Sequence, residues 1–468
     1  MKASRHRGIK ADCLLLPLAR MCPAIQPPNG TRDLYPIEAA RRRFITEAWR
    51  RVSINHGFEE IDGPTFEHLE LYTVKSGEGI VSELFSFRRE GGEKDFALRP
   101  EFTPTLARMY AARAGSLPKP TKWFTCGPFF RAERPQRGRL REFLQWNCDV
   151  IGLAVPEKAT AEDIASAKAT ADAEVIACCV EQFQGLGLTS AQISCQYNDR
   201  SAAAKVIEKS GQNLDVTRAL VLLDKRAKMD AREFAAACSQ MGFDIAKYDD
   251  LMAAAIESAR TGSGDAGGGL PLLAQKLDAM GMSDWCRIDA NIARGLAYYT
   301  GTVFEVIVDG ERAVAGGGRY DNLIELFGGP STPAVGFGMG DVVLSLVLQD
   351  KGLMPTDAEL LEIAGQRPDV FVISNGTPEA DAKLGSVVAE LRRSTGRQSH
   401  GLHVRRSYKA TRNVGKLLRE ASDIRARFAV ILESGTEATI KNLETGEQDQ
   451  ARTPVASLGE EIRRRRGN

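Results

Sequence analysis

The sequence predicts an α+β fold, in which an antiparallel sheet core carries a helical insertion and is followed by a smaller C-terminal α/β domain. Three observations support this prediction. β-rich runs cluster between residues 57 and 152, and a mostly helical stretch covers 200–282 before strands resume at Arg287. From residue 368 onward, strands alternate with helices.

Composition indicates a globular protein of two or three domains. The 468 residues include 62 Lys and Arg against 61 Asp and Glu, so any nucleic-acid surface must be a local patch. The nine cysteines form no CxxC pair and the five histidines lack metal-ligand spacing. We therefore predict buried, reduced thiols and no metal site. No run of about 18 apolar residues occurs, so no membrane-spanning helix is predicted.

Residues 1–25 are rich in Lys and Arg and contain the short apolar run CLLLPLA. Two interpretations stay open: a disordered extension ahead of Met21, or an organellar transit-like segment. The protein is expected in the cytoplasm under the first interpretation and in an organelle under the second.

The larger domain is predicted to span 26–199 and 283–353, with the helical insertion at 200–282. It begins with an amphipathic helix over 38–52 and strand-like runs around Pro64, at 84–87 and at 96–98. Runs at 123–130 and 143–152, joined by a charged loop, predict a long antiparallel hairpin. Helices are expected over 158–186 and 341–353.

A linker at 354–367 is predicted to lead into the α/β domain at 368–456. Its elements are the strand DVFVISN, a helix over 378–394, a short strand near 400–405, a basic helix and the strand RFAVILE. The last residues, 457–468, are predicted to form a basic tail, of which Arg463–Arg466 is expected to be disordered.

The segment ARGLAYYTGTVFE, residues 293–305, is a candidate ligand site. Arg294 lies in a Gly-rich turn, and Tyr298 and Tyr299 open a strand-like run that should send them to opposite faces. An arginine fork with phenolic hydroxyls suits a small zwitterionic ligand that carries a ring. Ordinary packing is the alternative.

The loop of the predicted hairpin is strongly basic, within FRAERPQRGRLREFLQWNCD at 130–149. Such a loop can wrap a polyphosphate, with Arg131 held on the strand. Arg139 and Phe143, four residues apart, could clamp and stack on a planar base. The alternative is a solvated charged turn.

Two further segments offer weaker signals. Glu101 and Thr103 lie two apart in a segment expected to be extended, and could receive an ammonium group or cap a helix. Three glycines precede Arg319 and Tyr320, which indicates a turn or a close approach of backbone to ligand. Their spacing matches neither nucleotide-binding glycine fingerprint.

Taken together and in this order, these segments resemble the histidyl-tRNA synthetases, a family of class II aminoacyl-tRNA synthetases, from about residue 25 to 452. The Pro64 region resembles the first class II motif, a dimer element, and FRAE with RLREF resembles the second. RGLAYYTGTVFE resembles the signature peculiar to the histidine-specific enzymes. The resemblance implies a class II sheet core, a homodimer, ATP with Mg²⁺, and activation of L-histidine to histidyl-adenylate before transfer to tRNA(His).

The resemblance also implies roles for single residues. Arg294 and Arg131 would stabilise charge on the α-phosphate, with no protein nucleophile or general base. The residues implied to hold histidine are Glu101, Thr103, Gln145, Asp149, Tyr298, Tyr299 and Tyr320. Those implied to hold ATP are Arg131, Glu133, Arg139 and Phe143.

The chain departs from the family pattern at three positions. Val343 stands where the third class II motif normally has an arginine for the ATP γ-phosphate. Ala297 replaces an acid that usually precedes the two tyrosines. Asp149 is one methylene shorter than the usual glutamate.

The domain at 368–456 resembles the anticodon-binding module of this enzyme group. Tyr408, Arg412, Lys416 and Arg419 fall at helical spacing and predict one basic face for tRNA, or else an ordinary solvated face. A non-catalytic histidine-sensing regulatory subunit of ATP phosphoribosyltransferase is the alternative function. Retention of Arg294, both tyrosines and the C-terminal domain favours the enzyme.

Overall fold

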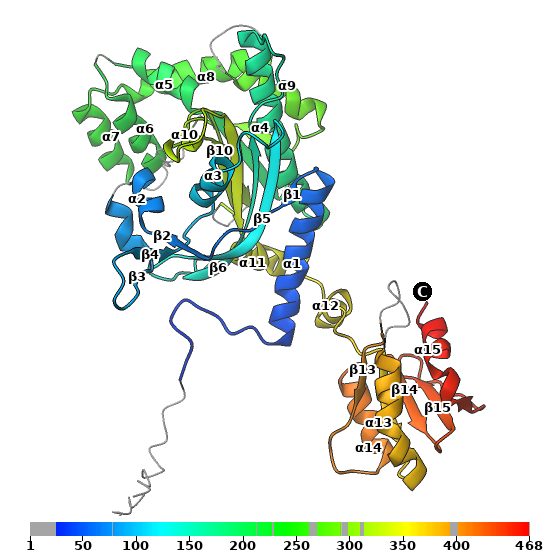
Figure 1. Ribbon diagram of the computed structural model, residues 1–468. Helices are drawn as coiled ribbons and strands as arrows, with labels where there is room; N and C mark the ends of the chain where they lie inside the picture. The colour runs from blue at the N-terminus through cyan, green and yellow to red at the C-terminus, as the bar shows by residue number, and fades with distance from the viewer. Residues whose placement is uncertain are drawn as a thin grey trace, which may run out of the picture.

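The computed structural model describes residues 25–76, 78–211, 213–226, 229–261, 269–290, 292, 298–308, 313–393 and 401–467. Across these residues the strands form three sheets, of eight, five and three strands. Figure 1 shows the five-stranded sheet in a C-terminal unit that is joined to the rest of the chain through α12 (Asp357–Ile363). Arg41 in the first helix pairs with Asp357 at 2.8 Å, so α12 contacts both parts of the chain.

The large sheet has the strand order β1-β5-β6-β11-β10-β9-β7-β8. Its central strands pair antiparallel, whereas β1 and β8 pair parallel at the two edges. The predicted antiparallel core and the long hairpin of β5 and β6 are therefore confirmed. The strands are β1 (Glu59–Glu60), β5 (Thr121–Phe130), β6 (Glu142–Ile151), β7 (Ile193–Asp199), β8 (Cys286–Ile288), β9 (Thr302–Val308), β10 (Ala315–Arg319) and β11 (Ala334–Gly340).

Alternating side chains along β6 give the large sheet two different faces. Trp146 and Cys148 are buried in a core with the helices on one face, which are α1 (Pro36–Asn55), α4 (Ala161–Gly185), α9 (Leu270–Ala279) and α11 (Asp341–Asp350). Gln145, Asn147 and Asp149 belong to the opposite face. There α3 (Thr103–Ala111) and α10 (Leu323–Leu326) pack with the strands. Part of this second face remains open for a cavity.

Two smaller units are attached to the large sheet. The predicted helical stretch forms several helices that share a separate hydrophobic core. They are α5 (Arg200–Lys209), α6 (Val216–Lys225), α7 (Ala231–Gln240) and α8 (Ile245–Thr261). The glycine-rich residues 262–268 lie outside the described residues. The small sheet pairs β2 (Phe66–His68), β4 (Asp95–Leu98) and β3 (Ser86–Arg88), next to α2 (Glu70–Ser76) and the 3₁₀ helix η1 (Glu78–Glu83).

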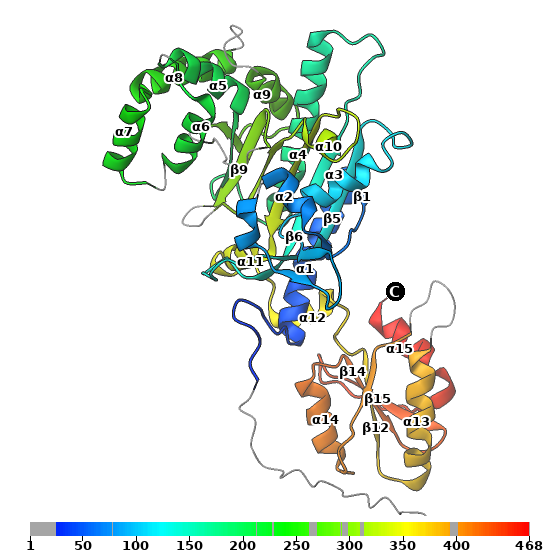
Figure 2. The same ribbon diagram turned by 60° about the vertical axis from the view of Figure 1, so that its left-hand side comes forward.

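The C-terminal unit is an α/β sandwich, as predicted. Its sheet contains β13 (Val404–Arg406), β12 (Val370–Ser374), β14 (Phe428–Leu432), β15 (Glu437–Asn442) and β16 (Thr453–Pro454), in that order. Figure 2 shows α13 (Pro378–Arg392) and α14 (Val414–Asp423) on opposite sides of this sheet. The short 3₁₀ helix η3 (Val455–Ser457) leads into α15 (Leu458–Arg466), which packs on the α13 side.

The prediction of a disordered basic tail is wrong. Leu458 and Ile462, four residues apart, are buried against the sheet and give α15 an apolar stripe. Arg465 pairs with Asp449 at 2.8 Å. The run of arginines concealed this short amphipathic pattern.

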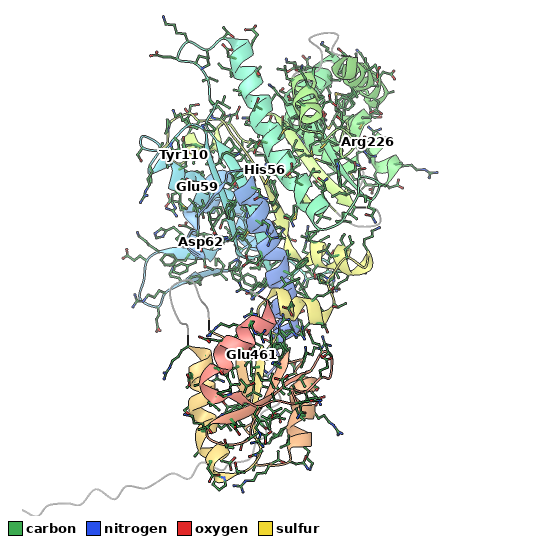
Figure 3. The ribbon with its side chains drawn as sticks, turned by 90° about the vertical axis from the view of Figure 1, so that its right-hand side faces the viewer. His56, Glu59, Asp62, Tyr110, Arg226 and Glu461 are labelled. Carbon is green, nitrogen blue, oxygen red and sulfur yellow. The ribbon has the colours of Figure 1, made fainter. Side chains whose placement is uncertain are left out.

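His56 ties the end of α1 to α4 (Figure 3). Its Nδ1 and Nε2 atoms lie 3.0 Å from the carboxylates of Glu174 and Glu181, respectively. The hydrogen bond to Glu174 contributes most to raising the pKa of His56 above its usual 6.5, and Glu181 adds to it against the opposing effect of burial.

We expect His56→Gln to lower the melting temperature more at pH 6 than at pH 9. Because the folded-state pKa is raised, the stabilisation is fully present below about pH 6.5 and is lost as the pH rises through the folded value. Each unit by which the pKa is raised corresponds to about 1.4 kcal/mol. Thermal unfolding at the two pH values measures the difference, and equal losses at both would contradict the charged contact.

Candidate active site

A cavity of about 560 Å³ opens on the second face of the large sheet. Its walls bring together segments that lie far apart in the sequence. Ten of the predicted site residues line it: Glu101, Thr103, Arg131, Arg139, Phe143, Gln145, Asp149, Tyr298, Tyr299 and Tyr320. Glu133 does not line the cavity but forms an ion pair with Arg139. Arg294 and Ala297 lie outside the described residues.

A carboxylate is buried deep in this cavity. Asp149 is 5% exposed and accepts a hydrogen bond from the hydroxyl of Tyr320 at 2.5 Å. Burial raises the pKa of Asp149 to about 7, although the hydrogen bond from Tyr320 opposes this shift. Burial also raises the pKa of Tyr320 well above its usual range, so this phenol remains a neutral donor.

The two adjacent tyrosines do not leave on opposite faces of a strand, and that prediction is wrong. Both precede β9, which begins only at Thr302, and their ring centroids are 4.8 Å apart in the same cavity. Tyr299 packs over Gly318, where a Cβ atom would come within 2.9 Å of its ring. Tyr298 donates from its hydroxyl to Glu101 at 3.3 Å.

Thr103 is the first residue of α3 rather than part of an extended segment, so the local structure predicted for Glu101 and Thr103 is wrong. Both residues nevertheless line the cavity. The helix begins there because Thr103 is followed by Pro104, a residue well suited to the first turn.

Glycines on β10 and β11 form the floor of the cavity, and most of this floor was missed at the sequence level. The strand AVGFGMG alternates glycine with larger apolar residues, so Gly336 and Gly338 line the cavity while Phe337 packs into the core. A Cβ atom on Gly336 would collide with the carboxylate of Asp149, and one on Gly338 with the amide of Gln145. Glycine at every second position of a strand is the signal that could have revealed this floor.

The three glycines before Arg319 are part of β10 rather than a turn. The alternative prediction was a close approach of the backbone to a ligand. The structure fits it, because Gly316 lines the cavity and Gly318 lies under Tyr299. Asn147 and Glu305 also line the cavity and were not predicted. Asn147 could have been found from its alternation with Asp149 along β6.

The cavity is positively charged at the end away from Asp149, because Arg131 and Arg139 line it there. The guanidinium of Arg131 lies over the ring of Phe143, 5.1 Å from its centroid. Burial lowers the pKa of Arg131, but a guanidinium remains charged in proteins. Gly138 at the tip of the hairpin loop packs against Val343, and its missing Cβ leaves room for this contact.

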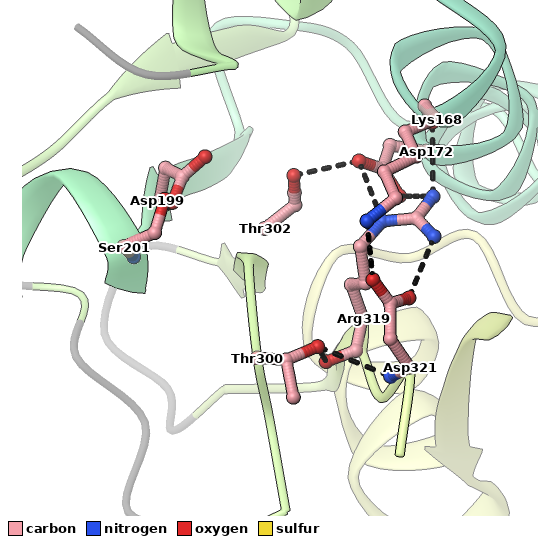
Figure 4. Close-up of polar contacts among 8 residues, drawn as sticks. All are labelled: Lys168, Asp172, Asp199, Ser201, Thr300, Thr302, Arg319 and Asp321. Atoms are coloured by element: carbon pink, nitrogen blue, oxygen red, sulfur yellow. Dashed lines mark hydrogen bonds and ion pairs between the residues drawn. The ribbon is translucent and has the colours of Figure 1, made fainter. Parts of the chain in front are cut away.

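A buried ion-pair network supports β10 directly beside Tyr320 (Figure 4). Arg319 pairs with Asp172 on α4 at 2.6 Å and with Asp321 at 3.0 Å. Asp172 also accepts a hydrogen bond from the hydroxyl of Thr302 at 2.7 Å. The Arg319 and Asp172 side chains are only 3% and 5% exposed, so the network holds the floor strands against the helical face.

Asp172→Ala is expected to destabilise the fold by about 3 kcal/mol, because it leaves the buried charge of Arg319 with Asp321 as its remaining ion-pair partner. The double variant Asp172→Leu with Arg319→Met should recover most of that loss. Chemical denaturation measures both. A loss below about 1 kcal/mol in the single variant would show that the pair does not support the strand.

The basic face of the C-terminal unit differs from the prediction. Tyr408 and Arg412 precede α14, which begins at Val414, whereas Lys416 and Arg419 are exposed on the helix. The four residues therefore do not share one helical face. Tyr408 is 82% exposed, and the guanidinium of Arg406 lies 5.0 Å from its ring centroid.

Throughout the described ranges, no helix combines the length and apolar character needed to cross a bilayer. Over the same ranges, no group of three or more His, Cys, Asp or Glu side chains is arranged to hold a metal ion. The described cysteines, which are Cys126, Cys148, Cys178, Cys179, Cys195, Cys238 and Cys286, are all free thiols.

Comparison with known proteins identifies the family. A family model described as histidyl-tRNA synthetase matches residues 30–341. The histidine–tRNA ligase of Haloarcula marismortui is 37% identical over 443 residues, covering 90% of this chain and 94% of that protein. The enzyme of the same name from Halobacterium salinarum is 36% identical over 446 residues, covering 92% of this chain and 96% of that protein.

A solved structure supports the fold. The crystal structure of a histidyl-tRNA synthetase from a Nostoc species matches with a TM-score of 0.71 at 22% identity, covering 95% of this chain and 100% of that one. The matched family model spans most of the chain, and the relatives are similar over nearly their full length. The chain therefore belongs to the histidyl-tRNA synthetase family.

Proposed function

We propose that this protein activates L-histidine with ATP to form histidyl-adenylate and then transfers the histidyl group to tRNA(His). The observation that carries the proposal is one cavity with a buried carboxylate among tyrosines at one end and an arginine stacked on a phenylalanine at the other. The first end suits an imidazole and the second a nucleotide. The similarity to histidine–tRNA ligases over most of the chain supports the same reaction.

The amino acid occupies the glycine-floored end in this proposal. Asp149 accepts a hydrogen bond from one ring nitrogen of histidine, and Tyr298, Tyr299 and Tyr320 surround the ring. The groups that receive the α-ammonium are Glu101, Thr103 and Gln145, which line the same cavity. A carboxylate with hydroxyl and amide oxygens suits a donor with three N–H groups.

ATP occupies the basic end. Arg131 binds the α-phosphate, Phe143 stacks on the adenine, and Arg139 with its partner Glu133 borders the nucleotide. Arg294 is proposed to act at the α-phosphate on the basis of the family signature alone. The apolar side chain of Val343 lines the cavity where the family usually has an arginine, so Arg131 and Arg139 carry more of the triphosphate charge.

The first step needs no protein nucleophile. A carboxylate oxygen of histidine attacks the α-phosphorus, the bond to the bridging β-phosphate oxygen breaks, and pyrophosphate leaves. Arginine guanidinium groups stabilise the charge that accumulates on the phosphate oxygens. In the second step a ribose hydroxyl of the tRNA terminus attacks the acyl carbon, and AMP leaves.

Magnesium is the metal expected with ATP. It is usually held by one or two carboxylates together with substrate phosphates, and it neutralises phosphate charge. The cavity fits this requirement, because the carboxylate of Glu305 lines it in addition to those of Glu101 and Asp149, which are assigned to the histidine. Glu305 on β9 would supply such an oxygen.

We further infer a homodimer acting in the cytoplasm. The small sheet supports the dimer, since Phe66 and Phe87 are 50% and 44% exposed with ring centroids 5.8 Å apart. Exposed aromatic clusters of this kind favour a protein partner.

The proposed function predicts that the protein charges tRNA(His) with labelled histidine in the presence of ATP and Mg²⁺. Replacing Lys416 and Arg419 together by glutamate should reduce this charging about 10-fold or more at moderate salt, because the double change reverses charge on the exposed face of α14. Histidine-dependent ATP–pyrophosphate exchange should stay near the wild-type rate, because it does not involve tRNA. Equal loss of both activities would contradict a tRNA role for this face.

A further inference from the structure

The strand β6 extends past the end of its neighbour β11 at the nucleotide end of the cavity. β11 pairs with β6 as far as Gln145, which lies opposite Gly340, the last residue of β11. β6 continues beyond this point through residues 142–144, and Phe143 in this stretch lines the cavity. Because backbone N–H groups need hydrogen-bond partners, other groups must take the place of β11 along this edge.

Residues 28–32, the N-terminal strap, supply one of these groups. The carbonyl oxygen of Gly30 accepts hydrogen bonds from the backbone N–H of Arg141 at 2.8 Å and from that of Glu142 at 3.3 Å. The strap also packs on the hairpin loop, since a Cβ atom on Gly30 would lie 2.7 Å from Cγ of Pro135. Gly30 has φ +87°, a left-handed conformation that favours glycine.

Arg32 of the strap supplies the second group through Asp341, the first residue of α11. The backbone N–H of Leu144 donates to Oδ1 of Asp341 at 2.9 Å. Nη2 of Arg32 lies 2.7 Å from Oδ2 of the same buried carboxylate and holds it in place. The strap therefore fixes the backbone on both sides of Phe143.

The two ends of the cavity depend on the strap to different degrees. Gln145 and Asp149, assigned to histidine, lie on the part of β6 that pairs with β11. Phe143 lies on the part that the strap holds, and the guanidinium of Arg131 stacks on its ring. A change in the strap should therefore disturb the nucleotide end and leave the amino-acid end in place.

We propose that the N-terminal strap positions Phe143 and the hairpin loop for ATP, with Arg32 as the positioning residue that acts through Asp341. This inference rests on the proposed function, since it takes Phe143 as the residue that stacks on ATP. The Arg32 side chain is 34% exposed, and ion pairs near the surface contribute little to overall stability. Its loss should therefore affect ATP more than folding.

Kinetics with both substrates test the role of Arg32. Arg32→Ala should raise the KM for ATP in histidine-dependent ATP–pyrophosphate exchange about 10-fold, and weaken ATP binding in calorimetry by a similar factor. The KM for histidine should stay near the wild-type value. Arg32→Lys keeps a positive charge near Asp341 and should recover most of the loss. A merely structural role would raise both KM values together.

Arg43→Ala is the matched control. Arg43 is 61% exposed and pairs with Glu47 of the same helix, so both KM values should match wild type. Gly30→Ala provides a second variant if Arg32→Ala fails to fold. Its added methyl group would collide with Pro135, so it should raise the KM for ATP selectively as well.

Wild-type KM for ATP and wild-type ATP affinity in both Arg32→Ala and Gly30→Ala would overturn the role of the strap, as would an equal rise in both KM values. Exchange by wild type would then leave the proposed function standing. Wild type without exchange would overturn the proposed function instead. In that case calorimetry still decides on the strap, because weaker ATP binding in Arg32→Ala supports its role and equal binding overturns it.

Discussion

Gly336→Ala is expected to reduce kcat/KM for histidine in ATP–pyrophosphate exchange by at least about 100-fold. The added methyl group would occupy the position of the Asp149 carboxylate and push it away from the ring that it is proposed to hold. A displacement of about 1 Å in an active site is enough for a loss of this size. The sheet itself should persist, because β11 keeps its pairing with β6 and β10.

Gly340→Ala is the matched control. Gly340 lies on the same strand and lines the same cavity, but its added methyl group would meet nothing closer than the Leu144 carbonyl oxygen at 4.0 Å. We expect a much smaller change in kcat/KM for this variant. Wild-type kinetics in Gly336→Ala, with both variants equally well folded by circular dichroism, would show that the glycine floor does not position Asp149.

Asp149→Asn is expected to lower kcat/KM for histidine on the order of 100-fold at pH 8. The loss corresponds to removing a charged hydrogen-bond acceptor from a buried site, and the KM for ATP should change little. Wild-type kcat/KM for histidine should rise with pH and level off above about pH 7, as the carboxylate ionises. The variant should lose this dependence and keep only the titration of free histidine itself.

Stability provides an independent readout of the same group. The pKa of Asp149 is about 7 in the folded protein, above the usual value of about 3.9, so its contribution to stability falls as the pH rises from about 4 to 7. Asp149→Asn should therefore raise the melting temperature more at pH 8 than at pH 5.

Tyr320→Phe should shift the rise of kcat/KM for histidine to higher pH, because it removes the hydrogen bond that favours the ionised carboxylate of Asp149. A pH profile that is unchanged in both variants would contradict this account of Asp149.

Much of the fold followed from local pattern. The hairpin of β5 and β6 was predictable because two β-rich runs flank a charged loop with proline and glycine, and the C-terminal unit because strands and helices alternate. The helix α15 was missed because only Leu458 and Ile462 mark its apolar face, whereas its arginines indicated a solvated tail.

Site residues that belong to a sequence motif were predicted. Those that face the cavity only because of how two strands pair were missed. Asn147 and Gly338 belong to no motif, yet they face the cavity because β6 and β11 pair in a register that sets Gly338 opposite Asn147. One strand cannot reveal the register of its neighbour. Tyr298 and Tyr299 were predicted on opposite faces because they open a β-branched and aromatic run, whereas β9 begins only at Thr302.

ATP–pyrophosphate exchange with each of the twenty standard amino acids tests the central claim most directly. A single cavity that holds a buried carboxylate, tyrosines and a basic rim should support exchange with histidine alone, and only when ATP and Mg²⁺ are present. The purified protein is predicted to give this result, with Asp149→Asn strongly impaired. No exchange with histidine, or equal exchange with other amino acids, would contradict the assignment of this cavity as a histidine-activating site.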